Sequence, residues 1–384
     1  TFMAGCTLFR ITVNGVGCHG AMPEKGVDPL NIASHIYLSL QEIISREIGA
    51  KTPAVVTNFL DFALFTTFFP AILSGPIERS KSLLPQIKQP RCANADDVRF
   101  AAERLIEGTV KKVLLADNLA ILVNTAYADP AQFSGLELAF AAVAYALQIY
   151  CDFSAYSDMA IGSARLFGIT LMENFHAPYM AQSSKEFWHR WHISLSTWFK
   201  EYVYIPLGGN RKGLPRQLFN ILVVWMLTGI WHGAGWNFLF WGLWFAFFLI
   251  LEKLFLGDIL ESVPKVFGRI YTLAVVLISW VFFALESPGE ILAYLQAMFG
   301  MNGIGPVNSL AMFLCNEYLV LLVIALVACL PLGSRLVHAL KSSKTGPAMA
   351  LYRLGEKVIP AVLLLLSVAY IVDASYNPFL YFRF

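Results

Sequence analysis

His232 is the residue with the clearest potential for chemistry, because it lies inside a long apolar stretch. Residues 218–251 contain no Lys, Arg, Asp or Glu, and Gly233 and Gly235 follow the histidine closely. An ionisable side chain within a membrane segment is energetically costly, so its presence indicates a function. Burial favours the neutral imidazole, which is the form that a general base needs near pH 7. We therefore expect His232 to act as a general base.

His192 is a second candidate, in the most polar part of the chain, residues 173–217. A helix starting at Ser184, with Ser as the N-cap and an acidic first turn, would place His189 and His192 one turn apart among aromatic residues. His189 suits a structural or surface role, whereas His192 suits structure and chemistry equally. A metal site is not expected, because no third ligand lies at a suitable spacing from this pair.

Membrane helices must position these histidines. A spanning helix needs about 20 residues, so residues 218–251 are too long for one helix. The sequence TGIWHGAG at 228–235 interrupts this stretch. We predict two helices that meet or bend at residues 232–235. Residues 270–285, 318–332 and 358–372 predict three further spans.

The composition indicates a membrane protein. The chain has 384 residues, of which 57% are hydrophobic and 14% charged. Soluble domains carry about 25% charged residues, so an ordinary cytosolic enzyme and a disordered chain are both excluded. A net charge of +2 implies no nucleic acid or other polyanion as a partner. Basic residues collect in the loop 333–357 and acidic ones in 286–317, which predicts a multi-pass topology with the basic loop in the cytoplasm.

The first fifty residues differ from the rest. Residues 9–15 alternate like a strand and end in a turn signal, and residues 29–47 have the apolar spacing of an amphipathic helix. We expect a short soluble β–α appendage over residues 1–50 and an all-α membrane core over residues 52–384.

Several motifs of the core strongly resemble the membrane-bound O-acyltransferases, and within them the alginate O-acetyltransferase branch. The two most specific motifs are EFWHRWHISLSTW at 186–198, followed by YIPLGGNR at 204–211, and TGIWHGA at 228–234. SGPIER at 74–79, QIYCDFSAYSD at 148–158 and NPFLYFRF at 377–384 support them. The resemblance runs from about residue 52 to the end of the chain and implies a multi-helix acyltransferase core.

This resemblance implies acyl transfer, with His232 as the general base. His192 would orient His232, bind a substrate or stabilise developing charge. Asp152, Asn210 and Arg211 would line the path of a substrate, and Trp231 would shape the tunnel. The donor would be acetyl-CoA or another acyl thioester, with no tightly bound cofactor.

The same resemblance implies an acceptor and a location. The acceptor would be an exported polysaccharide, a periplasmic protein that relays the acyl group, or both. The protein would be a multi-pass protein of the bacterial inner membrane, in contact with lipid.

A second resemblance concerns residues 8–48. GCHGAMP at 17–23 and GVDP at 26–29 resemble part of the satellite domain of zinc amidohydrolases of the aminoacylase and hippurate-hydrolase type. Nothing in this chain supplies the zinc-binding cluster of that family, so no metal is expected. Acyltransferases of the first family carry several more helices before the position of residue 58. Two alternatives therefore stay open, namely an inactive or scaffold membrane protein and the remnant of an amidohydrolase fusion.

Overall fold

The structure is a computed structural model that describes residues 59–72, 75–89, 92–305, 309–342, 346–373 and 379. Within these residues every regular element is a helix, and no strand is present. The prediction of an all-α fold is therefore confirmed. The predicted β–α appendage of residues 1–50 lies outside the described residues.

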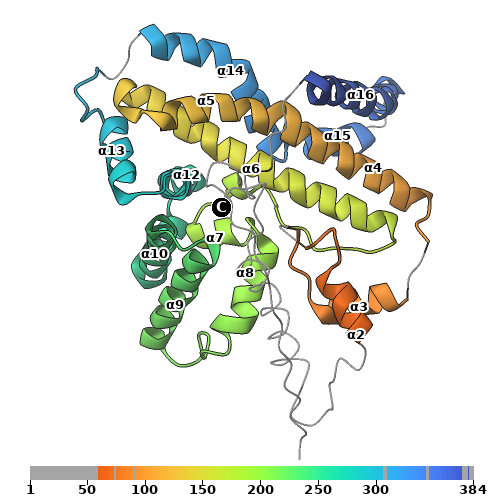
Figure 1. The fold of residues 1–384 in the computed structure, drawn as a ribbon, viewed down its shortest axis with the longest axis horizontal. Helices are drawn as coiled ribbons and strands as arrows, with labels where there is room; N and C mark the ends of the chain where they lie inside the picture. The colour runs from red at the N-terminus through yellow and green to blue at the C-terminus, as the bar shows by residue number, and fades with distance from the viewer. Residues whose placement is uncertain are drawn as a thin grey trace, which may run out of the picture.

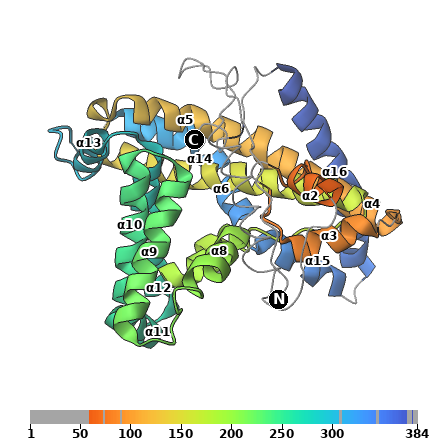
Figure 2. The ribbon, with the colours of Figure 1, turned by 60° about the horizontal axis from the view of Figure 1, so that its bottom comes forward.

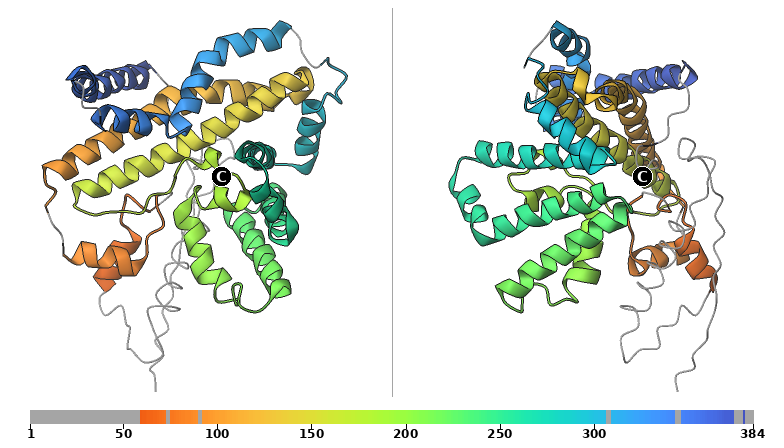
Figure 3. Two further views of the ribbon diagram at one scale, coloured as in Figure 1. Left: turned by 180° about the vertical axis from the view of Figure 1, so that it is seen from behind. Right: turned by 60° about the vertical axis from the view of Figure 1, so that its left-hand side comes forward.

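A layer of long helices forms one side of the molecule. α4 (Ala95–Val110), the π-helical turn η3 (Lys111–Ala116) and α5 (Asp117–Ala128) lie end to end. They run beside α6 (Gly135–Leu166), as Figures 1 and 3 show. α6 starts with a capping box, in which Ser134 Oγ accepts a hydrogen bond from the Glu137 N–H and the Glu137 carboxylate accepts one from the Ser134 N–H.

α9 (Leu214–His232) and α10 (Trp236–Leu251) pack side by side and stand across this layer (Figure 2). The predicted break at residues 232–235 is confirmed, because α9 ends at His232 and α10 begins after the glycine-containing turn. The two helices touch at glycines. A Cβ added to Gly229 would lie 2.4 Å from the backbone oxygen of Phe238, so only glycine permits this approach. This contact fixes the end of α9 against α10.

Among the described residues, four helices are long and apolar enough to cross a membrane. In the described residues these spans are Gly135–Leu166, Trp236–Ser262, Lys265–Ala284 and Tyr352–Val372. A shorter apolar helix covers Asn316–Cys329. The predicted spans at 270–285 and 358–372 fall on two of the four, and 318–332 overlaps the shorter helix. The remaining elements of this part of the chain are η7 (Glu252–Leu256), α11 (Gly257–Ser262), α12 (Lys265–Ala284), α13 (Pro288–Met298), α14 (Ser309–Cys329), α15 (Leu332–Ser342) and α16 (Gly346–Asp373).

Short elements connect the two helix groups. α2 (Phe59–Thr66) and α3 (Ser80–Lys88) lie together, and the one-turn helices η4 (Pro130–Gln132) and η5 (Pro178–Met180) flank α6. After η5 come α7 (Ser184–Trp188), α8 (Ile193–Phe199) and the π-helical η6 (Lys200–Tyr204).

The prediction of one helix carrying both His189 and His192 is wrong. The N-cap is Ser183, α7 ends at Trp188, and His192 has a left-handed backbone that starts a second helix.

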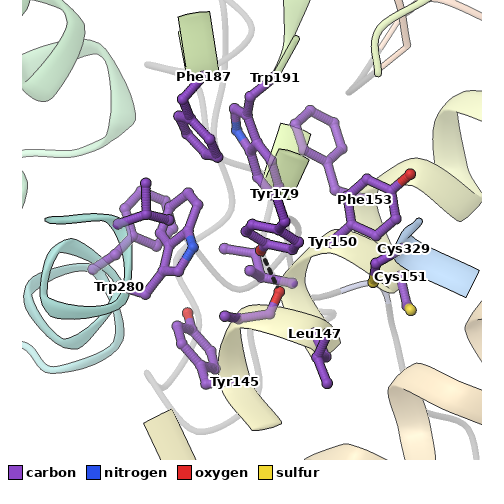
Figure 4. Packing of buried hydrophobic residues seen from close by; sticks show 14 of the residues in the cluster. Tyr145, Leu147, Tyr150, Cys151, Phe153, Tyr179, Phe187, Trp191, Trp280 and Cys329 are labelled. Atoms are coloured by element: carbon purple, nitrogen blue, oxygen red, sulfur yellow. Dashed lines mark hydrogen bonds between the residues drawn. The ribbon is translucent and has the colours of Figure 1, made fainter. Parts of the chain in front are cut away.

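The core between the two groups is aromatic. Figure 4 shows Trp191 beside Phe187, Tyr179 and Trp280, all buried. The Trp191 ring stacks on Phe187 at 5.6 Å between centroids and lies 4.9 Å from Trp280. Such ring pairs contribute about 0.5–1.5 kcal/mol each beyond area burial. This cluster joins α7 to α12 and provides the rigid base of the site described next.

Candidate functional site

His232 is the last residue of α9 and is held by aromatic packing. Its half-buried ring contacts four others, with centroid distances of 4.8, 4.9, 5.2 and 6.4 Å to Trp231, Trp241, Phe283 and Phe238. These rings come from α9, α10 and α12. The imidazole therefore lies where three helices meet, in apolar surroundings.

His192 lies in the turn between α7 and α8 and is buried, with 3% of its surface exposed. Its backbone is left-handed, with φ 44° and ψ 54°, a conformation that costs a non-glycine residue about 1–2 kcal/mol. Backbone hydrogen bonds hold this turn, from the Ile193 N–H to the Asn174 oxygen (3.0 Å) and from the His176 N–H to the Arg190 oxygen (2.9 Å). Strain of this kind is typical of functional sites.

Trp231 links the two histidines. Its half-buried ring lies 4.8 Å from the His232 ring and 6.3 Å from the His192 ring. Burial, and secondly the nearby charge of His232, hold the pKa of His192 well below its usual value. His192 is therefore neutral at pH 7. The structure brings together three of the residues predicted from the sequence, namely His192, Trp231 and His232.

Asn174 was missed by the sequence analysis, although it is the closest polar partner of His192 among the described residues. Its side chain is buried, with 1% exposed. Its Oδ1 lies 3.4 Å from His192 Nδ1 and accepts hydrogen bonds from Ser194 N (3.1 Å) and Ser194 Oγ (2.7 Å). Its Nδ2 donates to Ser157 Oγ on α6 (3.3 Å). A lone asparagine in a loop carries no periodic signal, so only the fold shows this contact.

A cavity of about 290 Å³ opens between α7–α8–η6 on one side and α9–α10 on the other. Its walls are mostly aromatic and aliphatic, with Trp188, Phe199 and Trp225 among them. Exposed Lys185 and Lys200 also line it. On α9 the lining runs up to Thr228, one helical turn before His232. The cavity therefore leads towards the histidines.

Asp152 lies in a buried ion pair. It is 2% exposed on α6, and its carboxylate accepts a hydrogen bond from Lys112 Nζ at 2.8 Å. Lys112 also pairs with Asp117 at 2.8 Å. The next residue, Phe153, is the one that faces the site, with its ring 4.8 Å from His192. Neighbouring residues on a helix point about 100° apart, which explains the different surroundings of Asp152 and Phe153.

Asn210 and Arg211 are also separate from the histidines. Both are exposed in the turn before α9, whereas His232 ends that helix. At 1.5 Å per residue, α9 separates them by about 27 Å. The turn packs instead on Tyr204, whose backbone oxygen accepts a hydrogen bond from the Gly209 N–H at 2.9 Å. Because Tyr204 lines the cavity, Asn210 and Arg211 lie beside its outer end.

The fold and the site define a helical membrane protein with two histidines around one tryptophan and an apolar cavity beside them. Residues 32–288 match the membrane-bound O-acyltransferase family, which is more than half of the chain. The protein therefore belongs to this family and is an O-acyltransferase.

Individual relatives agree with this assignment. The chain is 37% identical to a probable alginate O-acetylase AlgI of Pseudomonas putida, over 93% of this chain and 75% of the relative. It is 32% identical to the corresponding protein of Azotobacter vinelandii, over 93% and 76%. A peptidoglycan O-acetyltransferase of Helicobacter pylori is 36% identical over 65% and 48%.

These matches bear on the N-terminal segment. The family match begins at residue 32, inside the predicted appendage. The matches lend no support to an amidohydrolase-like interpretation of residues 8–48. The domain boundary near residue 50 stays a prediction.

Proposed function

We propose that this protein transfers an acetyl or other acyl group from a thioester donor to a hydroxyl of an exported polymer. The observation that carries the proposal is the contact of the His192 and His232 rings with Trp231 in a chain of this family. The names of the relatives specify alginate and peptidoglycan, which supports a polymer acceptor. A periplasmic relay protein is a further acceptor, and the bacterial inner membrane is the proposed location.

The proposed reaction uses His232 as the general base. His232 takes the proton of the acceptor hydroxyl while the oxygen attacks the thioester carbonyl carbon. The tetrahedral intermediate then collapses, the carbon–sulfur bond breaks, and the thiolate receives the proton from the imidazolium. General base catalysis contributes about 10²- to 10⁴-fold. His192, neutral and fixed by hydrogen bonds, orients His232 through the shared tryptophan and polarises the reacting groups.

The cavity between α8 and α9 is the proposed binding site of the donor. An acyl thioester such as acetyl-CoA has an anionic nucleotide end and an uncharged arm that carries the acyl group. Lys185 and Lys200 supply positive charge, and the aromatic walls suit the arm. Asn210 and Arg211 lie beside the outer end of the cavity and are proposed to contact the anionic part. Trp231 separates the acyl group from the surrounding helices.

The test is acetyl transfer from radiolabelled acetyl-CoA to alginate oligosaccharides by membranes that contain the protein. His232→Ala should lower the rate by about 10²- to 10⁴-fold. His176→Ala is the matched control, because this histidine is exposed in the adjoining loop, and it should leave the rate unchanged. Activity of His232→Ala within threefold of the wild type would remove His232 from the mechanism. Absence of transfer by the wild type would favour the scaffold alternative.

A further inference from the structure

We infer that Asn174 is a positioning residue that sets the tautomer of His192, so that Nδ1 carries the proton and Nε2 keeps its lone pair. The inference rests on the proposed function of the histidine pair. Asn174 lies 18 residues before His192 in the chain, in the loop that follows α6. Its amide side chain is buried and forms hydrogen bonds with Ser194 and Ser157.

The orientation of the Asn174 amide follows from its neighbours. The backbone N–H of Ser194 can only donate, and it points at one side-chain atom of Asn174 at 3.1 Å. That atom must be the oxygen, because the amide nitrogen is itself a donor. The nitrogen then donates to Ser157 Oγ at 3.3 Å on α6. The amide is therefore held from both ends and cannot rotate to offer its nitrogen to His192.

The tautomer of His192 follows from this orientation. A neutral imidazole has one donor and one acceptor nitrogen. Nδ1 lies 3.4 Å from the side-chain oxygen of Asn174. If Nδ1 carried no proton, its lone pair would face a lone pair of this oxygen and the two would repel each other. Nε2 is then the acceptor. The hydrogen bond from the Ile193 N–H to the Asn174 backbone oxygen holds the same two segments together, so the arrangement is fixed at two points.

In the described residues, the groups that contact the His192 ring are uncharged side chains. Its ring neighbours in the described part of the chain are Phe153 of α6 and Trp231 of α9, besides Asn174. The titratable group whose charge acts on it is His232. A neutral amide therefore sets the tautomer without adding a charge that would favour the imidazolium form. A carboxylate at position 174 would accept the same hydrogen bond but would favour the charged ring.

The test combines rate, pH and coupling measurements on the full chain in membranes, with radiolabelled acetyl-CoA and alginate oligosaccharides. Asn174→Ala should lower kcat by about 10- to 100-fold. This lies between the rate loss from one missing hydrogen bond and the rate loss from a histidine in the wrong tautomer. The KM values for donor and acceptor should stay within twofold. Asn174→Asp should recover most of this loss at high pH and move the acidic limb of the rate profile upward by about 1–3 pH units.

A double-variant cycle separates positioning from structure. If Asn174 acts through His192, the variant carrying both His192→Ala and Asn174→Ala should be as active as His192→Ala alone. Asn220→Ala is the matched control, since this asparagine is 0% exposed and donates to the Gly209 oxygen at 2.9 Å. The fold loss of activity caused by Asn220→Ala should multiply with the fold loss caused by His192→Ala.

Two outcomes overturn different claims. If the Asn174→Ala loss multiplies with the His192→Ala loss, or Asn174→Asp leaves the pH profile unmoved, Asn174 only holds the loop and the inference fails. If His192→Ala itself stays within threefold of the wild type, the proposed function of His192 fails instead.

Discussion

α6 carries two polar regions on opposite faces, and they are built in different ways. On the face towards α4 and η3, Lys112 pairs with Asp152 at 2.8 Å and Lys111 pairs with Asp158 at 2.7 Å. All four side chains are buried. Burial alone would lower the pKa of Lys111, but the carboxylates of Asp158 and Glu107 together outweigh it, and the pKa is raised. This face is a set of ion pairs that join three helical segments.

On the other face of α6 the polar contacts are neutral. Ser157 accepts a hydrogen bond from Asn174, and Phe153 packs on His192. The charged residues of α6 therefore lie on a different face from the residues that contact the proposed catalytic site. Ion pairs hold helices together and are costly to break, whereas neutral groups orient an imidazole without changing its charge.

Asp158→Ala should show the largest effect on stability. It removes the carboxylate that pairs with Lys111 and also with Arg104 at 3.2 Å. Lys111 keeps a second carboxylate, that of Glu107 at 2.6 Å, and Arg104 keeps that of Glu173, but both of these acids are exposed. Removing the buried partner of a buried cation therefore costs up to about 3–5 kcal/mol. Unfolding by sodium dodecyl sulfate in mixed micelles measures this loss. An unfolding midpoint equal to that of the wild type would show that the ion-pair face does not hold the helices together.

Asp152→Asn distinguishes the two faces directly. The sequence predicts a substrate contact for Asp152, and the structure shows a pair with Lys112. We expect a loss of about 1–3 kcal/mol of stability, since a charged hydrogen bond is weakened, and an unchanged acceptor KM. A raised KM with unchanged stability would return Asp152 to the substrate path.

His192, on the neutral face, should make the free energy of unfolding depend on pH by about 1 kcal/mol. Burial lowers the pKa of His192 below its unfolded value of about 6.5. Below that pH the unfolded chain binds a proton that the folded chain does not, so stability falls as the pH falls. Between pH 7.5 and 5.5 the wild type should lose about 1 kcal/mol more than His192→Gln in the same unfolding assay. Equal losses would contradict the lowered pKa.

Arg211→Ala should have the smallest effect. Arg211 is exposed and lies beside the outer end of the cavity, far from both faces of α6. We expect a donor KM raised by about twofold to fivefold with unchanged kcat, as befits a screened surface charge. Steady-state rates over a range of acetyl-CoA concentrations measure it. A fall in kcat alone would place Arg211 in the chemical step.

Much of this organisation could be predicted from the sequence, because it depends on local pattern. The break between α9 and α10 follows from the glycines around His232, and the long spans follow from apolar runs. The pairing of His192 with His232 rested on motif resemblance, and the shared contact with Trp231 is consistent with it.

The rest depends on contacts between distant parts of the chain. The partner of Asp152 is Lys112, 40 residues earlier, and no local pattern connects them. The sequence predicts one amphipathic helix here, but the left-handed backbone at His192 interrupts it. The Ile193 N–H donates its hydrogen bond to the backbone oxygen of Asn174 rather than to the preceding helical turn. A single asparagine in a loop gives no sign of this role in the sequence.

The central claim is that His192 and His232 form one catalytic unit. The most direct test is acetyl transfer by His192→Ala, His232→Ala and the variant with both changes, with radiolabelled acetyl-CoA and alginate oligosaccharides. Residues that act as a unit have strongly non-additive effects. We predict that the double variant is as active as the slower single variant. Losses that multiply would show that the two histidines act independently, and would contradict the account.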